Sequence, residues 1–287
     1  MAAAAKIAFC FPGQGSFEAG MGRDIAEVVP AARAVYENGS IASGLDLERL
    51  CFHGTPEELF DTAVQQPALV APSLAMLAAA QAMTADEAIA LVRERGIAMA
   101  EAAARHPGSM AAILGLDDEV VEMICRKILG VWPANYNCPG QIVVSGENLA
   151  VDECCELATE QGARRAVKLK VSGAFHSPLV ARAADRLRPA IEKVKFQEPV
   201  APFMSTVTAR IESAHRMGPL LVDQLTAPVR FTQAATELMR EGVRTFVEVG
   251  PGNVLSGLVK RIDRSVKAVS INNLDALDRL HELLAEA

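Results

Sequence analysis

The chain lacks the cysteine spacings that mark metal sites and disulfide frameworks. Its six cysteines include no C-x-x-C pair and no combination with histidine at the spacing of zinc ligands. These absences exclude a structural zinc finger and a small disulfide scaffold, and no bound metal is expected. A reducing cytoplasm is the compartment that this cysteine usage predicts.

The chain also lacks any block of basic residues. Its net charge is -7, and the acidic and basic residues are intermixed along the sequence. A protein that binds nucleic acid normally presents clustered Lys and Arg to the phosphates. Nucleic acid is therefore not an expected partner.

Long hydrophobic runs are missing as well. The first apolar run ends at Pro12 and Gly13, too early for a secretory signal. The longest later run, residues 67–83, is rich in alanine and contains Pro72, so we expect no membrane span. With 51% hydrophobic and 22% charged residues over 287 positions, the sequence predicts one large globular core with a small insert.

Both ends of the chain show the pattern of an α/β domain. Lys6–Phe11 is a compact apolar run that predicts a buried strand, and the capping box Thr84–Glu87 predicts a helix to about Arg105. Later strands are predicted over residues 202–207, 245–249 and 268–271, and helices over 231–241 and 254–262. Alternation of this kind predicts a mostly parallel sheet covered on both faces.

Residues 109–171 follow a different order, β-α-β-β-α-β, which is typical of the ferredoxin-like unit. The predicted strands cover residues 110–116, 131–135, 141–146 and 165–171, and the predicted helices cover 117–129 and 149–161. We therefore predict a small ferredoxin-like domain over 109–171. The large domain is then discontinuous and consists of residues 1–108 and 172–287.

Six sequence blocks, in this order, resemble those of the malonyl-CoA:acyl carrier protein transacylases. They are FPGQGSFEAGMG, QQPALVAPSLAML, LVRERG, NYNCPGQIVVSG, GAFHSPL and PVRFTQAATELMREGVRTFVEVGPGNVLSGLVKRI. The resemblance implies an α/β-hydrolase-like large domain and a ping-pong reaction. In this reaction a serine takes malonyl from malonyl-CoA, and the phosphopantetheine thiol of acyl carrier protein then takes it from the serine. Fatty acid or polyketide synthesis is the implied setting, and no bound cofactor is expected.

By the same resemblance, the catalytic machinery includes His176 and Gln14. His176, in GAFHSPL, is the general base, and histidine can accept and return a proton near neutral pH. The resemblance implies that its other ring nitrogen bonds a main-chain carbonyl in segment 228–230, which includes Arg230. The main-chain N–H of Gln14 is implied as an oxyanion donor. A nucleotide-binding loop is the alternative, but GQGSFEAG does not fit G-x-G-x-x-G.

Four residues are predicted to bind substrate. Arg95 lies on the apolar face of its helix, where a guanidinium is costly unless it meets an anion such as the malonyl carboxylate. A structural Arg–Glu pair or a snorkelling side chain is the alternative for Arg95. Phe175 and Asn137 match family blocks, although a core position and a turn explain them equally well. Gln66 lies in the matching QQPALV block.

The sequence contains no G-x-S-x-G pattern, which the resemblance places on a strand, turn and helix between Gln81 and Thr84. Such a segment needs roughly 20 residues, whereas only two separate these positions. Three hypotheses follow. The chain is an acyltransferase that lacks a segment, a non-catalytic relative that binds acyl-CoA or carrier protein, or an α/β-hydrolase that uses water.

Overall fold

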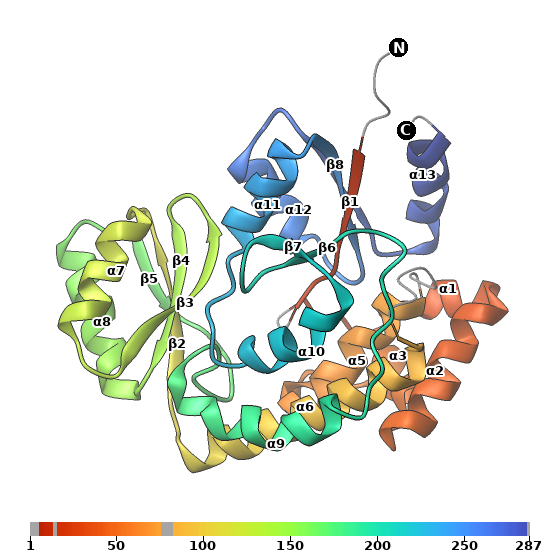
Figure 1. Cartoon of the computed structure of the whole chain (residues 1–287), viewed down its shortest axis with the longest axis horizontal. Helices are drawn as coiled ribbons and strands as arrows, with labels where there is room; N and C mark the ends of the chain where they lie inside the picture. Colours follow the sequence, from red (N-terminus) through yellow and green to blue (C-terminus); the bar gives the residue numbers. More distant parts are fainter. Residues whose placement is uncertain (1–5, 14–15, 76–82, 286–287) are drawn as a thin grey trace. The chain divides into compact units, whose positions relative to one another are not determined.

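The computed structural model describes residues 6–13, 16–75 and 83–285 (Figure 1). The chain forms two compact units. The first comprises residues 1–96, 197–201 and 238–287, and the second comprises 97–196 and 202–237. The domain boundaries predicted at 108/109 and 171/172 stay a prediction.

A parallel sheet forms the centre of the first unit. Its strands lie in the order β1 (Lys6–Cys10), β8 (Val243–Val249) and β9 (Lys267–Ile271), and both pairings are parallel. Val247, Val249 and Ile271 form a core with helix α13 (Leu274–Ala285), while α12 (Val254–Ile262) packs on β8 and β9. The predicted parallel sheet is confirmed. Its strands are apolar because a covered parallel sheet buries them.

The helices that follow β1 in the described chain, up to the next strand, belong to the first unit, except that the last of them, α6 (Ala85–Arg105), continues into the second unit from residue 97. They are α1 (Arg23–Val28), α2 (Pro30–Ser43), α3 (Leu47–His53), α4 (Pro56–Phe60), α5 (Thr62–Ala75) and α6. Tyr36, Leu47 and Ile89 are buried in their common core. Gly96 allows α6 to approach α5 closely, since a Cβ at this position would lie 3.0 Å from both Ala63 Cα and the Thr62 carbonyl oxygen.

The predicted capping box at the start of α6 is confirmed. The Thr84 N–H donates to Glu87 Oε2 at 2.9 Å, and the Glu87 N–H donates to Thr84 Oγ1 at 3.2 Å. The backbone hydrogen bond from Thr84 lowers the pKa of the Glu87 carboxyl. The stabilisation that this carboxylate provides is therefore present at neutral pH and is lost as the pH falls through the lowered pKa.

Replacement of Thr84 by alanine is expected to destabilise the protein by about 1 kcal/mol, because an N-terminal N–H of α6 loses its acceptor. Urea unfolding would measure the change. Thr159→Ala is the control, since the Thr159 hydroxyl only donates to the Cys155 carbonyl within a helix. Equal stability of T84A and the unaltered chain would contradict this role for the cap.

The ferredoxin-like unit is confirmed in the second compact unit. Its elements are β2 (Ser109–Leu114), α7 (Asp118–Lys127), β3 (Val131–Cys138), β4 (Gln141–Gly146), α8 (Asn148–Glu160) and β5 (Arg165–Lys168). The antiparallel strands lie in the order β3-β4-β2-β5, and α7 and α8 cover one face (Figure 1). Ile113, Val121, Ile142 and Val151 lie in the core between the helices and the sheet.

The remaining elements follow the ferredoxin-like unit along the chain. They are the 3-10 helix η1 (Pro178–Val180), α9 (Ala181–Ile191), β6 (Phe203–Ser205), β7 (Arg210–Glu212), α10 (Ala214–Asp223) and α11 (Phe231–Arg240). The strand predicted at 202–207 was assigned to the α/β alternation, and this assignment is wrong. β6 pairs with β7 in an antiparallel hairpin, and the Ala209 N–H donates to the Ser205 carbonyl at 2.9 Å across its turn. An apolar run alone does not reveal which sheet a strand joins.

Candidate active site

His176 lies in a turn with an unusual backbone. Its φ is 57°, and among the described non-glycine residues only Ala209 shares a positive φ. Left-handed backbone is costly for most side chains and is found disproportionately at functional sites. Phe175 is only 2% exposed and Ser177 is fully buried, so both neighbours of His176 are fixed in the protein interior.

The imidazole of His176 contacts the end of helix α10. Its Nδ1 lies 3.0 Å from the main-chain carbonyl oxygen of Gln224, the C-cap residue of this helix. Because a carbonyl oxygen only accepts hydrogen bonds, Nδ1 must carry the proton in this contact. In the neutral ring the lone pair is then on Nε2. This is the tautomer that a general base needs in order to take a proton through Nε2.

The expectation that the carbonyl belongs to segment 228–230 is wrong. The Val229 carbonyl accepts the Tyr136 N–H at 2.8 Å, and the Arg230 N–H donates to Thr206 at 2.8 Å. The Arg230 guanidinium lies over the Tyr136 ring, 5.8 Å from its centroid. This segment therefore pairs with β3, and the carbonyl that meets His176 is that of Gln224.

Arg95 and Gln66, both in the first unit, lie in direct contact. Arg95 Nη1 donates to Gln66 Oε1 at 2.5 Å, and the Gln66 side chain is buried. Burial lowers the pKa of the Arg95 guanidinium to about 10, so it stays charged at neutral pH. A neutral amide orients this cation without cancelling its charge. The arrangement suits an arginine that receives a carboxylate.

The other predicted site residues are Asn137, Phe175 and Gln14. Asn137 lies on β3 and is partly buried. Phe175 belongs to the core, where only 2% of it is exposed, and its role as a substrate contact stays a prediction. Gln14 lies outside the described residues, as does Gln81 at the junction where the serine segment is expected.

Sequence reasoning missed Gln224 and Ser177. Gln224 contributes a main-chain carbonyl, which every residue type carries, so no side-chain pattern could reveal it. Ser177 did offer a signal, because serine followed by proline is a common start of a helix. In the structure Ser177 caps η1, and its Oγ accepts the Leu179 N–H at 3.3 Å.

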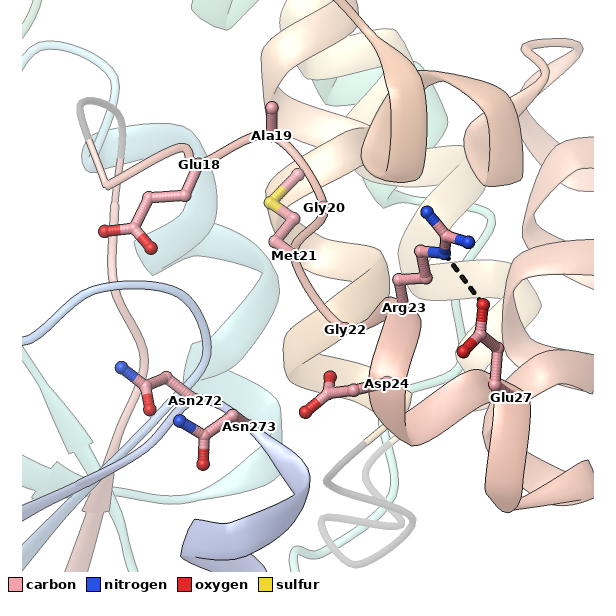
Figure 2. A pocket seen from close by; sticks show the side chains of 10 residues that line it. All are labelled: Glu18, Ala19, Gly20, Met21, Gly22, Arg23, Asp24, Glu27, Asn272 and Asn273. Carbon is pink, nitrogen blue, oxygen red and sulfur yellow. Dashed lines mark hydrogen bonds and ion pairs between the residues drawn. The ribbon is translucent and has the colours of Figure 1, made fainter.

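A cavity of about 390 Å³ lies elsewhere in the first unit (Figure 2). It is lined by the segment 18–24 together with Glu27, Asn272 and Asn273. Several of its polar groups bond to the protein itself: Arg23 pairs with Glu27, and Asp24 Oδ2 accepts the Leu274 N–H at 2.6 Å. None of the predicted site residues lines this cavity.

Two negative findings concern the described part of the chain. Within it, no group of three or more His, Cys, Asp or Glu side chains could hold a metal ion. None of the helices described there has the length and apolar character needed to cross a membrane.

Comparisons with known proteins agree with the resemblance. A family model described as the acyl transferase domain matches residues 73–276. The malonyl CoA-acyl carrier protein transacylase of Bacillus subtilis (strain 168) is 38% identical, and the match covers 98% of each chain. That alignment spans 310 residues, more than the 287 of this chain, so the relative contains positions with no counterpart here.

Solved structures show the same fold. The acyl-carrier-protein S-malonyltransferase of Bartonella henselae is 36% identical and has a TM-score of 0.93, with coverage of 97% of this chain and 99% of that one. A malonyl-transacylase solved with its type II PKS acyl-carrier protein is 34% identical, with a TM-score of 0.93 and coverage of 97% and 100%. The chain therefore belongs to the acyltransferase family that contains the malonyl-CoA:acyl carrier protein transacylases.

Proposed function

We propose that this protein is built to transfer malonyl from malonyl-CoA to the phosphopantetheine thiol of an acyl carrier protein. The observation that carries the proposal is the contact between His176 Nδ1 and the Gln224 carbonyl. This contact holds the imidazole in the tautomer that acyl transfer needs. The relatives of the chain are named as malonyl transferases of the same kind.

The reaction divides into two acyl transfers. In the first, a serine oxygen attacks the thioester carbonyl of malonyl-CoA while His176 Nε2 takes its proton, and the C–S bond breaks to release coenzyme A with that proton. In the second, the carrier-protein thiol attacks the malonyl ester, and the serine regains a proton through His176. The main-chain N–H of Gln14 is our proposed donor to the oxyanion. This chemistry needs neither a metal nor a bound cofactor.

Substrate selection is assigned to Arg95. Its charged guanidinium, oriented by Gln66, would pair with the free carboxylate that malonyl has and acetyl lacks. Asn137 and Phe175 are proposed as further substrate-binding positions. We place the protein in the cytoplasm because its cysteines are free thiols, and because coenzyme A and carrier-protein thiols must also remain reduced there.

A second candidate function is binding without catalysis. It is favoured by one observation, the absence of a G-x-S-x-G pattern from the sequence. A relative of this kind would bind acyl-CoA or carrier protein and form no acyl-enzyme. Sequencing the gene and its transcript across Gln81 and Thr84 separates the two candidates. A reading frame that encodes the serine segment supports the enzyme, and an uninterrupted junction supports the binding protein.

The proposed function is tested with a version of the chain in which a strand, a G-H-S-x-G turn and a helix are inserted between Gln81 and Thr84. This version is expected to transfer malonyl to a phosphopantetheinylated carrier protein, as measured by mass spectrometry of the carrier. His176→Ala in the same background should abolish transfer. A folded insertion variant that leaves the carrier unmodified would contradict the proposal.

A further inference from the structure

Ser177 is buried beside His176 and makes two hydrogen bonds within the turn. Its side chain is 0% exposed. Its hydroxyl donates to the Ala174 carbonyl at 2.7 Å and accepts the Leu179 N–H at 3.3 Å. The two bonds join the residues before His176 to the residues after it. The turn is thus closed on itself through one side chain.

The backbone of His176 needs such support. A φ of 57° is unfavourable for a side chain with a Cβ, and it persists only where the surroundings enforce it. On the other side of the turn, a Cβ at Gly173 would lie 2.5 Å from Ala103 Cβ, so this part of the turn is pressed against α6. The Ser177 hydroxyl constrains the part of the turn between Ala174 and Leu179, which contains His176.

The direction of the imidazole depends on this backbone. If φ of His176 relaxed to the common negative range, the Cα–Cβ bond would point elsewhere, and Nδ1 would leave the Gln224 carbonyl. The Ser177 hydroxyl links Ala174, two residues before His176, to Leu179, three residues after it. The hydrogen-bonded hydroxyl of Ser177 is therefore linked, through the backbone, to the tautomer of the ring.

We propose that Ser177 is a positioning residue for His176. Its hydroxyl holds the turn in the conformation that keeps Nδ1 on the Gln224 carbonyl, and thereby keeps the lone pair of the neutral ring on Nε2. The inference rests on the proposed role of His176 as the general base. It adds a residue that touches neither substrate nor the reacting atoms.

The test is the tautomer of His176 in Ser177→Ala, measured by NMR on the whole chain labelled with ¹⁵N-histidine. The chain has five histidines, and the His176 signals are identified by their loss in His176→Gln. At a pH where the ring is neutral, the ratio of Nδ1–H to Nε2–H tautomer is expected to fall about three- to tenfold in S177A, the size of one lost hydrogen bond.

Ser43→Ala is the matched control. Ser43 is also buried, and its hydroxyl donates to the Gly39 carbonyl at 2.7 Å and accepts the Leu45 N–H at 3.3 Å. This variant loses the same pair of bonds in the other compact unit. The His176 tautomer ratio is expected to stay unchanged in S43A. A fall of equal size in both variants would show general loosening and overturn the proposal.

An unchanged tautomer ratio in folded S177A overturns the proposal directly. If S177A does not fold, Ser177→Cys is measured instead, since a thiol fills a similar space but is a weak donor. An unchanged ratio in S177C is then the overturning result, and a lowered ratio supports the proposal. Malonyl transfer is not part of this measurement. A failed transfer assay would refute the proposed function and leave the tautomer result standing.

Discussion

Incubation of the chain with malonyl-CoA is expected to yield no covalent malonyl adduct by intact-mass spectrometry. His176 can activate a hydroxyl only within hydrogen-bond reach, and the sequence has no serine in a G-x-S-x-G setting. Where catalytic residues cooperate, loss of the nucleophile alone lowers the turnover rate roughly a millionfold, because the base and the oxyanion donors act through it. Any residual acylation should therefore be undetectable.

Ser16 and Ser73 lie in the first two of the blocks shared with the family, and the same experiment tests both. Ser16 is buried, with 6% of it exposed, and it lies in the loop after β1 rather than at a strand-to-helix turn. Ser73 lies within the helical segment α5 rather than at a strand-to-helix turn. A malonyl adduct mapped to either serine would contradict the expectation and identify a relocated nucleophile.

Replacement of Arg95 by alanine is expected to weaken malonyl-CoA binding by about ten- to a hundredfold, the size of a charge-assisted hydrogen bond to a carboxylate. Acetyl-CoA has no free carboxylate, so its binding should change little. Calorimetry with both esters measures the difference, and it does not require the chain to turn over. Arg95 stays charged across the neutral range because its lowered pKa is still about 10.

Arg93→Ala is the matched control for Arg95. Arg93 lies two residues earlier on α6, and its Nη1 donates to the Ala63 carbonyl at 2.7 Å. Its loss removes a guanidinium from the same helix without removing the proposed carboxylate partner. Equal losses of malonyl-CoA and acetyl-CoA affinity in R95A would contradict the assignment. So would an R93A variant that loses malonyl-CoA affinity, relative to acetyl-CoA affinity, as strongly as R95A does.

Local patterns were enough to predict several elements of this fold. The capping box at Thr84 and the apolar periodicity after it predicted α6 with both of its ends, because these signals lie within the helix itself. The ferredoxin-like unit was predicted from the order of its strands and helices, β-α-β-β-α-β, over residues 109–171.

Contacts between distant segments could not be predicted in this way. The apolar run 202–207 predicts a strand of the α/β alternation, but it contributes β6 to an antiparallel hairpin with β7, since an apolar run does not encode its partner. Gln224 meets His176 through its main chain, so its side chain carries no signal. The contact of Arg95 with Gln66 joins residues on two helices, and the sequence predicts a substrate-binding role for each without predicting that they meet.

The most direct test of the account is the intact mass of the chain after a strand, a G-H-S-x-G turn and a helix are inserted between Gln81 and Thr84. After incubation with malonyl-CoA, this variant is expected to carry one malonyl group on the inserted serine. The same variant with His176→Ala should carry none. A folded insertion variant that gains no malonyl group, or one that is acylated equally well without His176, would contradict the central claim that His176 is poised to activate a serine for acyl transfer.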